Sequence, residues 1–250
     1  MTRLPFDLGP PLGHRANFGL IVLRTDETIE HEARQVLQGD GVAHYVSRIP
    51  CETEVTMDAL ARMEAELPRS AALLPATHPY DVVGYGCTSG ATRIGPDKVA
   101  AGVRAGIDAR AVTDPLTATI AACRALGITR LGFVTPYLPE VSDAMRAALT
   151  AAGLEIAGFG SMEEPSDERV ARIEAHSLRA AILSVAAQAP CDAVFLACTN
   201  LRALPIIAET EAELGKPVLT SNQALLWHMM VLAGLPTELL PFGALMRAGG

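Results

Sequence analysis

The chain has 250 residues, of which 50% are hydrophobic and 19% are charged, so it holds ample apolar material for a folded core. Its formal net charge is −8 and no Lys or Arg cluster occurs, which argues against a nucleic-acid footprint or a polybasic membrane patch. No apolar run approaches the ~18 residues of a membrane span, and the N-terminal stretch lacks the apolar segment of a signal peptide. We therefore expect a cytoplasmic protein that binds neither nucleic acid nor membrane.

Eight short runs rich in Val, Ile and Leu follow one another along the chain and are predicted to be β-strands. They are GLIVL (19–23), AHYVS (43–47), DVVGYG (81–86), ARAVT (109–113), RLGFVT (130–135), LEIAGFG (154–160), DAVFLA (192–197) and KPVLTS (216–221). The stretches between them include four amphipathic patterns, 52–66, 139–152, 167–188 and 201–214, which predict helices. Continuous apolar strands that alternate with helices are typical of parallel sheets covered on both faces, so the predicted fold class is α/β.

The predicted strands form two matching sets. The stretch 81–89, DVVGYGCTS, aligns with 192–200, DAVFLACTN, so that Cys198 lies 111 residues after Cys87 (198 − 87). The other three strands of the first half find counterparts in the same order at similar offsets. Four matches in order predict two similar lobes related by a pseudo-twofold axis, each a short parallel sheet flanked by helices.

The duplication also predicts how the chain is divided. We expect residues 1–115 together with 223–250 to form the first lobe, and residues 116–222 to form the second. Ligands of parallel sheets bind at the carboxyl ends of the strands. The active site is therefore predicted in a cleft between the two lobes.

The five cysteines make neither a disulfide framework nor a zinc motif. Cys87 and Cys198 occupy equivalent positions, each at a strand end before a helix start, where a thiol pKa is expected to fall. Cys51, Cys123 and Cys191 have no duplicated counterpart and are interpreted as structural. We therefore predict Cys87 and Cys198 as catalytic residues, with no metal and no cofactor.

Polar residues surround the two cysteines at the same corners. Thr88, Ser89, Thr199 and Asn200 offer hydroxyl, amide and backbone N–H donors that can bind a substrate carboxylate and stabilise an enediolate. They can equally cap the following helices, and both roles are compatible. Tyr137, after the strand that mirrors the first one, can donate its hydroxyl to a carboxylate.

The paired strand–Cys–Thr corners, VTPY and the opening strand followed by TDETIE resemble the aspartate/glutamate racemase superfamily over nearly the whole chain, 18–235. The nearest branch contains maleate cis–trans isomerases, arylmalonate decarboxylases and the racemase-like proteins of ectoine utilisation. The resemblance implies that Cys87 and Cys198 are the two catalytic thiols. It also implies that Thr88, Ser89, Thr199 and Tyr137 bind substrate carboxylate. Arylmalonate decarboxylases have Gly in place of the first thiol, so the presence of both weakens a decarboxylase interpretation.

Asp26 departs from the maleate isomerases, which typically have Asn in the loop after the first strand. A carboxylate there would repel a second substrate carboxylate and attract an ammonium. The resemblance to the ectoine-utilisation branch then implies an amino-acid substrate of the 2,4-diaminobutyrate type. The alternative role of Asp26 is to cap the helix that follows.

Three functions stay open from the sequence. The first is a cofactor-independent racemase in which one thiolate removes an α-proton while the other thiol protonates the opposite face. The second is a maleate cis–trans isomerase with Cys87 as a covalent nucleophile, and an arylmalonate-type decarboxylase is a weaker variant. The third is a ligand-binding pair of lobes without chemistry. The expected partner is a small carboxylic or amino acid, and a homo-oligomer is neither predicted nor excluded.

Overall fold

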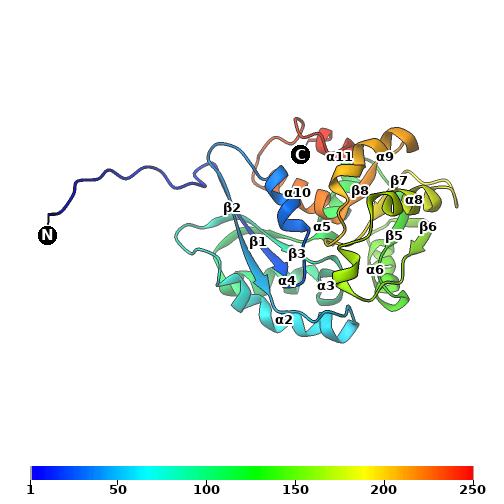
Figure 1. The fold of residues 1–250 in the computed structure, drawn as a ribbon, viewed down its shortest axis with the longest axis horizontal. Coiled ribbons are helices and arrows are strands. Elements are labelled where there is room, and N and C mark those ends of the chain that lie inside the picture. Colours follow the sequence, from blue (N-terminus) through cyan, green and yellow to red (C-terminus); the bar gives the residue numbers. More distant parts are fainter. Residues whose placement is uncertain (1, 250) are drawn as a thin grey trace.

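The computed structural model describes residues 2–249 and contains two four-stranded parallel sheets flanked by helices (Figure 1). All eight predicted strands are present. Their bounds are β1 (Ala16–Leu23), β2 (Val42–Ile49), β3 (Tyr80–Gly86), β4 (Ala109–Thr113), β5 (Arg130–Thr135), β6 (Glu155–Ser161), β7 (Ala193–Leu196) and β8 (Val218–Thr220). The α/β class predicted from the continuous apolar runs is confirmed.

The two sheets have the same strand order. The first is ordered β2-β1-β3-β4 and the second β6-β5-β7-β8, and every pairing is parallel. The strands therefore correspond one to one in the pairs that the sequence repeat predicted. The repeat thus reflects two lobes of the same topology.

Burial explains why the strands read as unbroken apolar runs. Every residue of β1 and of β7 is buried, because the inner strands are covered on both faces of their sheets. The edge strands β2 and β6 are only partly buried.

Within residues 2–249, twelve helical segments connect and cover the strands. They are α1 (Ile29–Val36), α2 (Met57–Ala71), α3 (Thr88–Ile94), α4 (Pro96–Gly106), α5 (Pro115–Ala125), α6 (Pro139–Ala151), α7 (Asp167–Val170), α8 (Ala175–Ala186), the 3₁₀ helix η1 (Leu204–Ile206), α9 (Ile207–Leu214), α10 (Ser221–Leu232) and α11 (Ala244–Arg247).

Three of the predicted helices differ from the structure, one of them 201–214, which begins with η1 at Leu204 and becomes α-helical only at Ile207. The stretch 52–66 begins its helix only at Met57, because the Thr56 side chain accepts a hydrogen bond from Ala59 N and caps α2 there. The stretch 167–188 is divided into α7 and α8. The irregular segments 50–56 and 162–166, which follow β2 and β6, come together through a bridge between Glu54 and Ser166.

The C-terminal part of the chain returns to the first sheet. Helix α10 packs against β3 and α5, and α11 packs against α10. Ala244 N also donates to the Glu211 carboxylate of α9, so the C-terminal segment touches both halves. The division at residues 115 and 222 stays a prediction.

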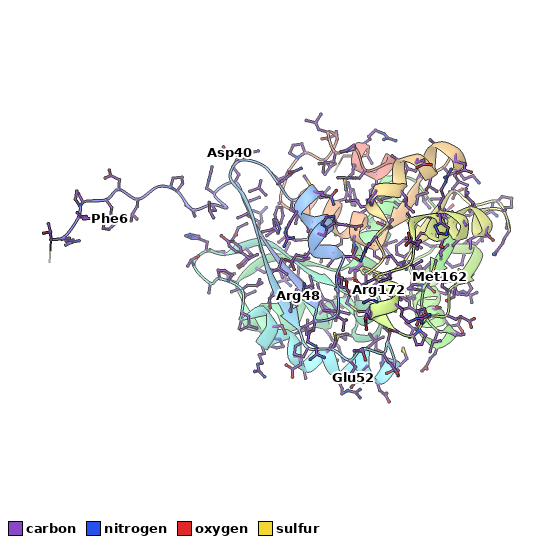
Figure 2. All side chains as sticks on the ribbon, in the orientation of Figure 1. Phe6, Asp40, Arg48, Glu52, Met162 and Arg172 are labelled. Carbon is purple, nitrogen blue, oxygen red and sulfur yellow. The ribbon has the colours of Figure 1, made fainter. Side chains whose placement is uncertain are left out.

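Residues 2–13 form an extended arm that runs away from the two sheets (Figure 1). Figure 2 shows Phe6 on this arm, where its side chain is exposed. No helix within residues 2–249 is both long and apolar enough to cross a membrane.

Candidate active site

The candidate site lies where the strand order reverses in each sheet. In the first sheet, β1 and β3 are neighbours whose following chains diverge to opposite sides, and β5 and β7 repeat this arrangement in the second. Such a switch point leaves a crevice at the carboxyl ends of the strands. Cys87 directly follows β3, and Cys198 follows β7 by two residues.

Both cysteines line one cavity. The cavity comprises about 410 Å³ of space not filled by atoms, part of it open to solvent. Cys87, Ser89, Tyr137, Cys198 and Thr199 all contribute to its wall. The rest of the wall comes from Leu23, Cys51, Glu52, Glu54, Val55, Ala59, Leu60, Met63 and Asp167.

Cys87 is the N-cap residue of α3. Its Sγ accepts a hydrogen bond from Gly90 N at 3.2 Å and lies 3.7 Å from Ser89 Oγ. A glycine is required at position 90, because a Cβ there would stand 2.5 Å from the Tyr85 hydroxyl and 2.9 Å from Cys87 Sγ. The cap thus fixes the thiol at the cavity and supplies N–H and O–H donors to it.

Cys198 is held in a rare backbone conformation with φ +121°. Such a conformation is strained for a residue with a side chain and persists only where its surroundings enforce it. Here Cys198 N donates to Ser221 Oγ at 3.0 Å, and Asn200 N donates to Cys198 Sγ at 3.4 Å. The nearby Tyr137 hydroxyl lowers the Cys198 pKa, because it can donate to the thiolate form.

The expectation that strand-end position lowers the thiol pKa is wrong for this structure. Burial raises the pKa of Cys87 to about 12 and that of Cys198 well above its usual value. The donors at each sulfur oppose this effect but do not outweigh it. Asp167 adds to the increase for both thiols, and no Lys, Arg or His lines the cavity within the described chain.

Thr88 and Asn200 join the two lobes and do not line the cavity. Thr88 Oγ1 donates to Ser221 Oγ at 2.8 Å, and that oxygen also accepts from Cys198 N. Asn200 Oδ1 accepts from Glu27 N at 2.8 Å, and its Nδ2 donates to Asp167 O at 3.0 Å. Their interactions hold the two cysteine corners against each other.

Asp26 lies behind the cavity wall. Its Oδ1 accepts from Thr28 N and Ile29 N, both at 2.8 Å, so it caps the start of α1. Its Oδ2 is buried and forms no hydrogen bond within the described residues. The nearby Thr199 side chain lowers the pKa of the Asp26 carboxyl group. Burial is the larger effect and raises the Asp26 pKa to about 7.

The sequence reasoning missed Asp167 and treated Cys51 as purely structural, yet both line the cavity. Thr25 Oγ1 donates to Asp167 Oδ2 and also lies 3.4 Å from Cys51 Sγ. Glu54 and Ser166 form an antiparallel bridge, which ties segment 50–56 to segment 162–166 over the site. No duplicated motif marks these residues: Cys51 lies in the segment after β2, and Asp167 begins α7 after the segment that follows β6.

Comparison with known proteins finds relatives of this chain. A sequence model of arylmalonate decarboxylase matches residues 103–246, more than half of the chain. A maleate isomerase of Pseudomonas putida is 27% identical over 91% of this chain and 96% of its own length. An arylmalonate decarboxylase of Bordetella bronchiseptica is 33% identical over 47% of this chain and 50% of its own length.

Solved structures agree with these relatives. A cysteine-to-serine mutant of the Nocardia farcinica maleate cis–trans isomerase, with a covalently bound succinylcysteine intermediate, has a TM-score of 0.84 at 25% identity. It matches 94% of this chain and 99% of its own. The Pseudomonas putida S16 maleate isomerase has a TM-score of 0.83 at 25% identity, over 93% of this chain and 98% of its own.

The two-lobed fold with thiols at its switch points defines a class, the aspartate/glutamate racemase-like enzymes of two parallel α/β lobes. Within that class the chain belongs to the arylmalonate decarboxylase family, whose sequence model covers more than half of it. The resemblance inferred from the cysteine corners is confirmed at this level.

Proposed function

We propose that this chain is a cofactor-independent isomerase of a small carboxylic acid in which Cys87 and Cys198 carry the chemistry. The observation that supports this most strongly is that both cysteines are buried and line the same cavity. They follow corresponding strands of the two sheets. Ser89, Thr199 and Tyr137 line the same cavity, and the Ser89 and Tyr137 hydroxyls would bind the substrate carboxylate, whereas the Thr199 hydroxyl donates to Gly86 O. The maleate isomerase relatives support an isomerase.

As a racemase, the site would use the two sulfurs as base and acid. One thiolate would take the α-proton, and the C–H electron pair would enter the carboxylate as an enediolate. The other thiol would then give its proton to the opposite face of that carbon. The Ser89 and Tyr137 hydroxyls would stabilise the enediolate by donating to its oxygens.

As a cis–trans isomerase, the site would form a bond to sulfur. The Cys87 thiolate would add to one carbon of a C=C bond, and the displaced electron pair would move toward the carboxylate on the other carbon. The Cys198 thiol would protonate that carbon, which leaves a single bond free to rotate. Reversal of both steps would release the trans isomer. The succinylcysteine intermediate of the Nocardia relative supports this route.

The amino-acid racemase in ectoine utilisation, with a substrate of the 2,4-diaminobutyrate type, remains the more specific proposal. Its support from sequence was Asp26, which the structure places at the start of α1 and outside the cavity wall. An acidic residue is nevertheless present in the cavity, because Asp167 lines it. A decarboxylase is disfavoured because both thiols are present.

The test is an NMR assay in heavy water with maleate, 2,4-diaminobutyrate and phenylmalonate. Formation of fumarate supports the cis–trans route, exchange of the α-proton with inversion supports the racemase, and loss of carbon dioxide supports a decarboxylase. The racemase and cis–trans activities should fall strongly in both Cys87→Ser and Cys198→Ser, whereas a decarboxylase should depend on Cys198 alone. Activity that persists in both variants would show that the thiols do not carry the chemistry.

A further inference from the structure

Asp167 is the acidic side chain held inside the cavity next to the thiols. It is only 4% exposed, although it lies at the start of the short helix α7. Its Oδ2 accepts the Thr25 hydroxyl from the loop after β1, and no hydrogen bond to Oδ1 forms within residues 2–249. One carboxylate oxygen is thus fixed, and the other is available to a bound molecule.

Both lobes hold this carboxylate in place. Asp167 N donates to Thr53 O at 3.2 Å, and Asp167 O accepts from Asn200 Nδ2 at 3.0 Å. The Glu54–Ser166 bridge joins the same two segments just beside it. Asp167 therefore cannot move away from a ligand without breaking contacts to both segments.

The charged side chains that line the cavity are all acidic, and Arg62, which does not line it, pairs with one of them, Glu52. Asp167, Glu52 and Glu54 line it, and no cationic side chain does so within the described chain. A substrate carboxylate can still be held by the neutral hydroxyls of Ser89 and Tyr137. A second carboxylate would have no cation to pair with and would face Asp167 at low local dielectric.

We infer that Asp167 determines substrate class, selecting acids whose second polar group is an ammonium over acids with a second carboxylate. An ammonium offers three donors and a charge that complements the Asp167 carboxylate. This inference rests on the proposed function only in that both use the same cavity. It assigns to Asp167 the selectivity that the sequence suggested for Asp26.

The test uses two four-carbon acids that do not react, so that binding is measured without turnover. Succinate carries a second carboxylate, whereas 4-aminobutyrate carries a terminal ammonium. Titration calorimetry of the wild-type protein at pH 7 should show about tenfold or more tighter binding of 4-aminobutyrate. Asp167→Asn should reduce that ratio by about tenfold, and Asp167→Glu, which keeps the charge, should preserve it.

The matched control is Glu168→Gln in the same turn. Glu168 is exposed and pairs with Arg172 outside the cavity, so the ratio should change by less than about twofold. Tighter binding of succinate by the wild type, binding of neither acid, or an unchanged ratio in folded Asp167→Asn would each overturn the inference. Should Asp167→Asn not fold, the wild-type ratio and Asp167→Glu still decide it. A negative result in this binding test would not contradict the proposed role of the thiols, because the cysteine variants test that role separately.

Discussion

Cys87 and Cys198 occupy equivalent corners but are held by different means. Cys87 has an extended backbone and caps α3, whereas Cys198 has φ +121° and is fixed by Ser221. Each sulfur accepts one backbone N–H, from Gly90 and from Asn200. The two thiols therefore share a role in the proposed reaction while their local environments differ.

Replacing either thiol by a hydroxyl should remove the proposed activity. Cys87→Ser and Cys198→Ser should each lower kcat/KM by about 10²–10⁴, because a serine hydroxyl is a far weaker acid and base at this position. Thermal unfolding should show that both variants remain folded. Cys123→Ser is the control, since Cys123 is buried in α5 and does not line the cavity, and its effect should be on stability alone.

The raised thiol pKa values predict slow alkylation of the folded protein. Burial raises the pKa of Cys87 to about 12, so its thiolate fraction at pH 8 is smaller than in the unfolded chain and grows about tenfold with each pH unit. Iodoacetamide labelling followed by peptide mass spectrometry should therefore be slower at Cys87 in the native protein than in guanidinium. Equal rates at pH 8 would show that the cavity does not suppress ionisation.

At the scale of elements, the hydroxyl of Ser221 connects the two cysteine corners. It is the first residue of α10 and accepts from both Thr88 Oγ1 and Cys198 N. Helix α10 also packs against β3, which leads into Cys87. The start of α10 thus couples the position of one thiol to that of the other.

Ser221→Ala should therefore affect both stability and activity. It leaves the buried Cys198 N–H without its acceptor, at a cost of about 1–3 kcal/mol in the free energy of unfolding. It should also lower kcat/KM, because the strained conformation of Cys198 loses a constraint. Urea unfolding and kinetics would measure the two effects. Ser184→Ala, at an exposed position of α8, should change neither.

At the scale of the whole molecule, two buried acids lie along the contact between the lobes. Glu32 of α1 accepts from Leu204 N and from Asn222 Nδ2, both in the C-terminal half of the chain. Burial raises the pKa of Glu32 to about 7, and repulsion from Asp26 contributes to the increase. Asp26 has a similar pKa, which repulsion from Asp167 also raises. The folded protein therefore holds protons that the unfolded chain would release.

This predicts a stability that falls as pH rises. Because the folded state binds the Asp26 and Glu32 protons more tightly than the unfolded chain does, this contribution to stability is complete below about pH 4. It is lost as the pH increases to about 7. Asp26→Asn mimics the protonated form and keeps the Oδ1 acceptor, so at pH 8 it should stabilise the protein by up to about 4 kcal/mol. At pH 4 the difference should be small.

Thermal unfolding of wild type and Asp26→Asn between pH 4 and pH 8 measures this effect. Asp40→Asn, in the exposed turn before β2, is the control and should follow the wild type at every pH (Figure 2). A pH-independent difference between Asp26→Asn and the wild type would show that Asp26 is ionised throughout and acts only as a helix cap.

The sequence by itself determined the strands, their parallel arrangement and the pairing of Cys87 with Cys198. These follow from local patterns, because a strand buried on both faces must be apolar along its length and a duplicated lobe repeats its corners. It also led to Ser89, Tyr137 and Thr199, which line the cavity. Each of these residues follows a strand at a switch point, where topology alone directs it to the cleft.

Only the tertiary structure decided which polar residues enter the cavity and how they ionise. Asp26 and Asp167 are both acids at the start of a helix. Asp26 accepts the backbone N–H of Thr28 and caps α1. Asp167 lines the cavity, where its side chain accepts from Thr25 and its backbone O accepts from Asn200. The raised thiol pKa values likewise depend on burial from all sides. Burial and long-range contacts are set by segments far apart in the chain, and no local pattern encodes them.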